Sequence, residues 1–203
     1  GNLGIGVTPD DQWDTFTALQ IGETGAISAH VDGTGAGSAI HITANAYYDS
    51  GWKHLIAGSD EASRYTQENG RHIFFTSSAN THSNAVSESE VMRISEAGLV
   101  TMQRSQADES LLLSMYSATD GHMPALLFKK SASNTLGTAA ATGSGDVLGQ
   151  IVFQGHDTDN DVKAGVIIRA KADAAPDGDS VPSKLEFMTS DLDDSGSPTT
   201  RMV

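Results

Sequence analysis

One loop of this chain carries acidic side chains at alternate positions, which is a pattern that can bind a metal ion. This loop has the sequence HDTDND, in which the acidic residues are Asp157, Asp159 and Asp161. Three carboxylates in a loop can turn toward one Ca²⁺ ion, which prefers oxygen ligands. An EF-hand loop that began at Asp157 would need Gly and Glu where the chain has Val162 and Ile168. The pattern therefore indicates a solvated hairpin turn first and a Ca²⁺ site as the alternative.

Other polar clusters give weaker indications of chemistry. A second acidic stretch, with the same two interpretations, contains Asp191, Asp193 and Asp194. Histidines fall within apparent strands at His41, His54 and His72. A general base needs a partner within hydrogen-bond reach, and nothing in the sequence supplies one nearby, so we interpret these histidines as strand-face or intersubunit residues. The 26 Asp and Glu residues are too many to select a glycosidase carboxylate pair.

Aromatic side chains are the best candidates for contact with a sugar. Trp52 lies close in sequence to Tyr47 and Tyr48, and Trp13 lies close to Phe16. Flat aromatic rings can stack on glycans, but in a chain with only 6% aromatic residues large rings are more often used for packing. We therefore expect packing first and glycan binding second.

The sequence contains none of the common catalytic motifs. G-x-S-x-G, a P-loop and H-E-x-x-H are absent, and without any Cys the chain has no thiolate nucleophile or Cys-based zinc site. The glycine-rich segment with Gly33, Gly35 and Gly37 is interpreted as a flexible turn and not as a phosphate cradle. We expect a non-enzymatic protein with no catalytic or cofactor-binding residue.

The charge balance argues against polyanionic partners. The chain contains 12 Lys and Arg residues and 26 Asp and Glu residues, which gives a net charge of −14. A surface with this charge repels nucleic acids and anionic membranes. The longest apolar runs are also far shorter than the roughly 20 residues of a membrane-spanning helix. Nucleic-acid binding and membrane insertion are not expected.

Short β-type runs separated by turn-forming clusters predict an all-β, mostly antiparallel protein. The predicted strands lie in the runs AIHITA, KHLIAG, RHIFFTS, LLLSMYS, ALLFKK, GQIVFQG, AGVIIRAKA and KLEFMTS. The polar loops expected to be outermost lie at residues 137–146, 156–161 and 173–183. Helix is expected only over residues 102–113 and in a short turn within TPDDQWDTF.

One motif occurs once whole and twice in part. EVMRISEAGLVTM, residues 90–102, alternates apolar and polar residues around a Ser-Glu-Ala-Gly turn, which predicts a strand, a turn and a strand. PTTRMV at the C-terminus resembles its first half and GNLGIG at the N-terminus its second half, with Met202 opposite Met92 and Leu3 opposite Leu99. This phase predicts two repeat units, 1–94 and 95–203, joined near 90–102, within a longer array.

The segments GNLGIGVTP, VMRISEAG, TTRMV and YYDSGW, and the series from GDVLGQIVFQGHD to KLEFMTSD, resemble repeat modules of tailed-bacteriophage tail fibres and tailspikes. In that family GNVGIGT and RMRI-type motifs often precede a self-cleaving C-terminal chaperone domain, and the segments form elongated homotrimers. The resemblance implies an extracellular virion protein whose partners are two further copies, other tail proteins and a host-surface glycan or protein. It implies a β-sandwich or an intertwined β fibre.

The expected function is structural: a trimeric tail-fibre segment that spaces or presents the receptor-binding surface. The residues expected to pack at the junction and the trimer axis are Leu3, Ile5, Met92, Ile94, Leu99, Met202 and Val203. The alternatives are a carbohydrate-binding receptor-recognition tip, a polysaccharide-degrading tailspike segment and the stalk of a bacterial surface adhesin.

Overall fold

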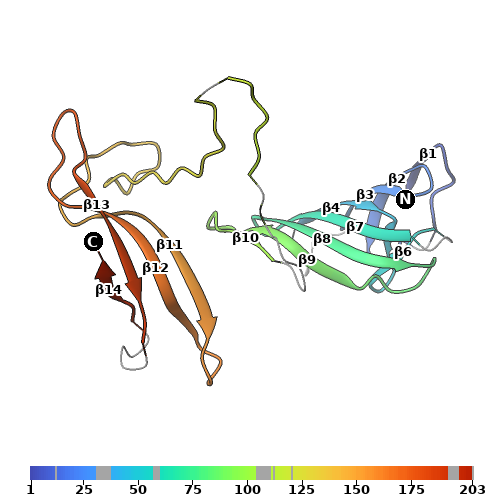
Figure 1. Cartoon of the computed structure of the whole chain (residues 1–203). Helices are drawn as coiled ribbons and strands as arrows, with labels where there is room; N and C mark the ends of the chain where they lie inside the picture. The colour runs from blue at the N-terminus through green and yellow to red at the C-terminus, as the bar shows by residue number, and fades with distance from the viewer. Residues whose placement is uncertain are drawn as a thin grey trace. The chain divides into compact units, whose positions relative to one another are not determined.

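A computed structural model describes residues 1–11, 13–30, 38–56, 60–103, 111, 113–119, 121–191 and 197–202. The described residues are all-β and mostly antiparallel, with no helix. The chain divides into two compact units, Gly1–Leu112 and Leu113–Val203. Each unit has its own sheet (Figure 1). The division falls later than residue 94, so the motif at 90–102 belongs wholly to unit 1.

Unit 1 is built on an eight-stranded sheet of order β1-β2-β3-β4-β7-β8-β9-β10. Its strands are β1 (Leu3–Ile5), β2 (Phe16–Ile21), β3 (Gly25–His30), β4 (Ala39–Ala44), β7 (Asp60–Glu68), β8 (Arg71–Asn80), β9 (Glu88–Ile94) and β10 (Val100–Met102). All neighbours are antiparallel except β1 and β2, which run parallel. The β9–β10 pair turns through Gly98, whose φ of 82° is easy for glycine.

Local sequence explains the tightest hairpin of this sheet. β7 and β8 are joined by only two residues, Asn69 and Gly70, with φ of 48° and 74°. An Asn-Gly pair accepts positive φ at both positions, which gives the hairpin a twist that matches its strands. The turn therefore fixes the register in which Glu68 faces Arg71.

A second, two-stranded sheet covers one face of unit 1. It consists of β5 (Ala46–Tyr48) and β6 (Trp52–His54), both within the connection from β4 to β7. The buried cluster beneath it contains Trp13, Phe16, Ala18, Ala26, Tyr47 and Leu55, with Tyr48 and Trp52 packed against its edge. Asn45 holds the layer in place, because its side-chain oxygen accepts from the N–H groups of Leu55 and Ile56 at 3.2 and 3.0 Å.

Unit 2 contains an antiparallel meander of order β11-β12-β13-β14. Its strands are β11 (Val147–His156), β12 (Val162–Ala172), β13 (Ser183–Thr189) and β14 (Thr199–Met202). The short turn between β11 and β12 is the predicted solvated hairpin, with Asn160 at a φ of 64°. β11 and β14 form the two edges of the sheet.

Several predicted elements differ from the structure. The runs LLLSMYS and ALLFKK contain no strand among their described residues, and the run KHLIAG contributes only its first residues to β6. The prediction of a short helix within TPDDQWDTF was wrong, because the described residues of this segment are irregular until β2 begins at Phe16. The predicted helix at 102–113 lies mostly outside the described residues, and Met102 belongs to β10. Within the part of the chain that the structure describes, no helix has the length and apolarity needed to cross a membrane.

Replacement of Tyr47 by Ala should destabilise unit 1 by about 3–5 kcal/mol, because it opens a cavity under the covering layer. Tyr47 is fully buried and lies edge-on to Trp13 at 6.2 Å between ring centroids. Urea unfolding followed by tryptophan fluorescence measures this, since both tryptophans of the chain, Trp13 and Trp52, belong to unit 1. Tyr116→Ala is the control, because that ring is 97% exposed. Equal midpoints for the two variants would contradict the assignment.

Candidate association face

The second face of the unit 1 sheet carries a continuous row of apolar side chains. Directly paired residues, one from each of the eight strands, are Leu3, Leu19, Ile27, Ile42, Tyr65, Phe74, Met92 and Met102. Their neighbours along each strand point to the opposite face, as strand geometry requires, and several of these are buried, such as Ala18, His41 and Thr66. The row itself is only partly covered: Leu3 is 62% exposed, Ile42 49% and Phe74 39%.

The rows on either side contain no charged side chain of the Asp, Glu, Lys or Arg type. One flanking row consists of Thr17, Ala29, Ile40, Gln67, His72, Ile94 and Val100. The other consists of Ile5, Ile21, Gly25, Ala44, Ser63, Thr76 and Ser89. The whole chain has 12 basic and 26 acidic residues, so this depletion sets the face apart from the rest of the surface. Depletion of charge is typical of the centre of a protein interface.

Unit 2 carries a matching row on its own sheet. Its paired residues are Ile151, Ile168, Phe187 and Met202. Met202 is 57% exposed and Ile151 43%. The four residues correspond in order to Ile42, Tyr65, Phe74 and Met92, because β11 to β14 repeat the pairing order of β4, β7, β8 and β9.

A β-bulge fixes this correspondence between the units. In unit 1, Phe74 pairs with Met92 but the next residue of β8 pairs with Glu90, so Val91 is the extra residue. In unit 2, Phe187 pairs with Met202 but the next residue of β13 pairs with Thr200, so Arg201 is extra. Met92 and Met202 are therefore equivalent in pairing as well as in sequence. A bulge re-aims the side chains beside it, and two bulges at one place indicate a shared design.

The residues predicted at the junction divide among several positions. Leu3 and Met92 belong to the unit 1 row, Ile5 and Ile94 to its flanking rows, and Met202 to the unit 2 row. Leu99 lies outside any strand, just before β10, with 67% of its surface exposed. Val203 lies outside the described residues.

The covered face of unit 1 contains a buried ionic network that the sequence did not reveal. The Arg64 guanidinium lies over the rings of Trp52 and Phe75, at 4.6 and 4.1 Å from their centroids. It donates to Glu88 through Nε at 2.8 Å and through a second nitrogen at 2.5 Å. His41 bonds Thr66 Oγ1 at 2.8 Å through Nδ1. Burial, and then the positive charges of Arg64 and His30, lower the pKa of His41 to about 4.

The candidate sugar-binding rings belong to the packed layer. Tyr47 has no exposed surface, so it offers no face to a ligand. Tyr48 and Trp52 are half-buried and lie against Phe16, with ring centroids 4.6 and 5.8 Å away. These contacts account for the aromatic residues through packing.

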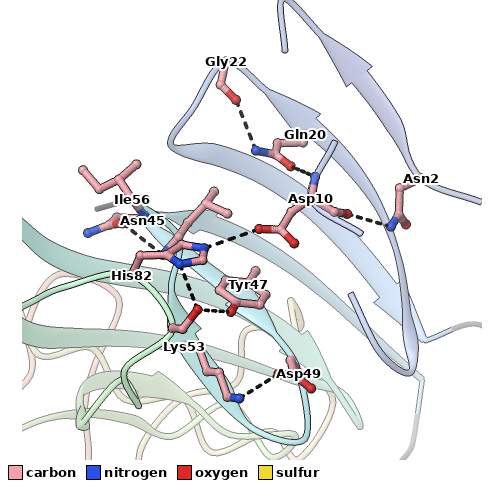
Figure 2. Close-up of polar contacts among 12 residues, drawn as sticks. Asn2, Asp10, Gln20, Gly22, Asn45, Tyr47, Asp49, Lys53, Ile56 and His82 are labelled. Atoms are coloured by element: carbon pink, nitrogen blue, oxygen red, sulfur yellow. Dashed lines mark hydrogen bonds and ion pairs between the residues drawn. The ribbon is translucent and has the colours of Figure 1, made fainter. Parts of the chain in front are cut away.

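A second series of polar contacts links the N-terminal segment to the β5–β6 layer (Figure 2). His82 lies 3.6 Å from an Asp10 carboxylate oxygen through Nε2 and 2.8 Å from Ser83 Oγ through Nδ1, and Ser83 Oγ in turn lies 3.2 Å from the Tyr47 hydroxyl. These are the residue types of a hydrolytic triad. The Ser83 and Asn84 N–H groups donate to the His54 and Thr81 carbonyls, so neither amide is available to stabilise an oxyanion.

The acidic loop is arranged as a turn. One oxygen of Asp157 accepts from the N–H groups of Asp159 and Asp161 at 3.0 and 2.9 Å, and hydrogen bonding from the Asp161 amide is the main cause that lowers the pKa of Asp157. The Lys163 ammonium lies 3.7 Å from Asp157 and 3.3 Å from Asp161. Among the described residues, no three His, Asp or Glu side chains gather to hold a metal ion.

Two further candidates fall partly or wholly on residues that the structure does not describe. Of the second acidic stretch, only Asp191 is described, and it forms an ion pair with Arg201 at 2.8 Å. Gly33, Gly35 and Gly37 lie outside the described residues. Of the remaining histidines considered, His54 is fully buried, and His72 is exposed and bonds the Tyr65 hydroxyl at 2.5 Å.

Comparison of the chain with family models, with curated proteins and with solved structures gave no match.

Unit 1 should lose stability as the pH falls from about 6.5 toward 4. The pKa of His41 is about 4 in the fold and about 6.5 when unfolded, so in this window protons bind the unfolded chain preferentially. His41→Gln should flatten this part of the pH profile, because glutamine does not titrate and is the residue at the equivalent position of unit 2, Gln150. Urea midpoints measured between pH 7 and 4 test this. An unchanged slope in the variant would refute the role of His41.

Proposed function

We propose that this chain is a structural segment of a virion tail fibre or tailspike, in which three copies cover one another's apolar rows. Supporting this proposal are the tail-fibre motifs of the sequence and their occurrence in two units of similar strand pairing. In this role the chain performs no catalysis. It spaces or presents a surface that contacts a receptor on the host cell.

The observation that carries the proposal is the apolar row, which recurs in both units at equivalent positions. A contiguous exposed apolar face of this kind is uncommon on a soluble monomer and marks an association surface. Burial of apolar area contributes about 25 cal/mol per Å², so covering such a row strongly favours association. Recurrence of the row at the same pairing positions argues that both units use it for the same purpose.

The charge of the chain fits a homo-oligomer that buries this face. Each copy carries a net charge of −14, and like charges on associating copies repel one another. The three paired rows of unit 1 carry no Asp, Glu, Lys or Arg, so copies that meet there keep their acidic groups in water. Water and salt then screen the repulsion between the outward-facing groups.

The mass of the purified chain in solution tests the proposal. Light scattering should give three times the 21.2 kDa of a single chain. A mass that stays at one chain across the accessible concentrations would refute the proposal and favour a self-contained β module.

A charged residue in the middle of the row should disrupt the assembly. Ile42→Asp places a carboxylate where association would desolvate it without a partner, at a cost of several kcal/mol. Since each 1.4 kcal/mol is a factor of ten, we expect at least a hundredfold weaker association, with the single chain still folded because Ile42 is half-exposed there. Thr119→Asp, at an exposed position outside the row, is the control. A trimer of unchanged stability in the Ile42 variant would place the interface elsewhere.

A further inference from the structure

The association face of unit 1, which consists of the apolar row and its two flanking rows, contains one histidine. It is His72 of β8, which pairs with Gln67 of β7 and with Ile94 of β9. The described residues of the three rows include no other histidine and no Asp, Glu, Lys or Arg. Since histidine changes its charge between about pH 5 and 8, His72 is the residue of this face that can respond to pH in that range.

Two contacts hold the His72 ring on this face. The Tyr65 hydroxyl bonds His72 Nδ1 at 2.5 Å, and when the ring is neutral with its proton on Nε2 the hydroxyl is the donor. The two rings are also stacked, with 6.0 Å between their centroids, and Tyr65 is stacked in turn on Phe74 at 4.8 Å. Since Tyr65 and Phe74 belong to the apolar row, a second copy that packs on these two rings also covers the histidine beside them.

The surroundings of His72 give little support to a positive charge. The ionisable groups in and beside the hollow that the ring lines are Tyr65 and Glu68 of β7, Arg71 of β8 and Glu96 after β9. The Glu68 carboxylate already pairs with Arg71 at 3.5 Å. Glu96 Cβ lies 3.4 Å from the position that a Cβ on Gly70 would take in the β7–β8 turn, and the residues of β4 at this hollow are uncharged. A proton on His72 would therefore add a charge next to an ion pair that is already formed.

Association would bury the His72 ring, and the cost of this burial depends on whether the ring is charged. A neutral ring keeps its hydrogen bond to Tyr65 when water is removed. A protonated ring would lose the water around its charge without gaining a carboxylate from the three rows of a second copy, and burial of an unpaired charge is costly. The separate chain therefore binds a proton at His72 more readily than the assembly does, so association weakens as the pH falls.

Unit 2 carries an apolar residue at the equivalent position. Phe187 is equivalent to Phe74, so Leu185, two residues before it, is equivalent to His72. Leu185 is 47% exposed on the same face as the unit 2 row. This position of the sheet therefore accepts a leucine, and the response to protonation is specific to unit 1.

We propose that His72 makes the association of the chain dependent on pH: copies associate while the ring is neutral and separate more readily once it binds a proton. This inference rests on the proposed homo-oligomer and adds a way in which its assembly is regulated. The general effect of charge has the opposite sign. Protonation of the other histidines reduces the net charge of −14 and so weakens the repulsion between copies.

Light scattering of a dilution series at pH 8 and at pH 5.5, at one ionic strength, measures the association constant of the trimer. If the assembly excluded the proton completely, this constant would fall by about tenfold per pH unit for each copy. For the unaltered chain we expect a fall of at least tenfold between the two pH values. In His72→Leu the constant should stay the same or rise toward pH 5.5. His72→Gln, which keeps a polar but uncharged side chain, should behave in the same way.

Two control variants separate this effect from other consequences of low pH. His156→Gln replaces an exposed histidine of unit 2 and should keep the fall in association. His41→Gln replaces the buried histidine whose titration affects the folding of unit 1, and it should also keep the fall. Tryptophan fluorescence of the same samples shows whether unit 1 is folded at both pH values.

The possible results distinguish this inference from the proposed function. A trimer whose association does not weaken toward pH 5.5, or weakens equally in His72→Leu, would overturn the role of His72 and leave the proposed function standing. A sample that never exceeds the mass of one chain at pH 8 would instead refute the proposed function.

Discussion

The structure depends on one constraint: a β-sheet has two faces, and the described residues of unit 1 cover only one face of its eight-stranded sheet. The β5–β6 layer and the cluster around Tyr47 cover that face and contain five of the chain's 12 Phe, Trp and Tyr residues, both tryptophans among them. The opposite face carries the apolar row at its centre, and no described element of unit 1 forms a layer over it. Strand alternation forces this outcome, since any apolar residue that does not point into the cluster must point away from it.

Sequence patterns identified the strands that alternate clearly and the hairpins that their turns define. AIHITA, RHIFFTS and KLEFMTS became β4, β8 and β13 because apolar and polar residues alternate within them. The phase between Met92 and Met202 was visible as well, and the bulges at Val91 and Arg201 give it a physical meaning. β7 was missed, since its buried positions include Arg64 and Thr66, whose burial depends on partners far away in sequence.

The candidate site was only partly accessible to sequence reasoning. The junction residues Leu3, Ile5, Met92 and Ile94 lie on the face with the apolar row, but the row runs across strands and so joins residues from the whole of unit 1. No local pattern encodes such a row; it appears only after the register of every pair is known. The strands predicted at 111–117 and 125–130 are absent from the described residues of these ranges. Their composition favours a strand, but a strand forms only when it pairs with another strand edge.

The connection that follows β4 is much longer than the connection that follows β11, although β4 and β11 are equivalent strands. One connection passes through a folded layer between Ala44 and Asp60, and the other is a short turn between His156 and Val162. Both strand pairs are antiparallel, and the β11–β12 pair differs from β4–β7 by register shifts between Val147 and Gly149 and between Phe153 and Gln154. This connection is a point at which material can be inserted or removed without changing the order of the strands. Diversity in such repeats can accumulate at this point, and a foreign loop or small domain grafted between His156 and Val162 would be displayed on an unaltered frame.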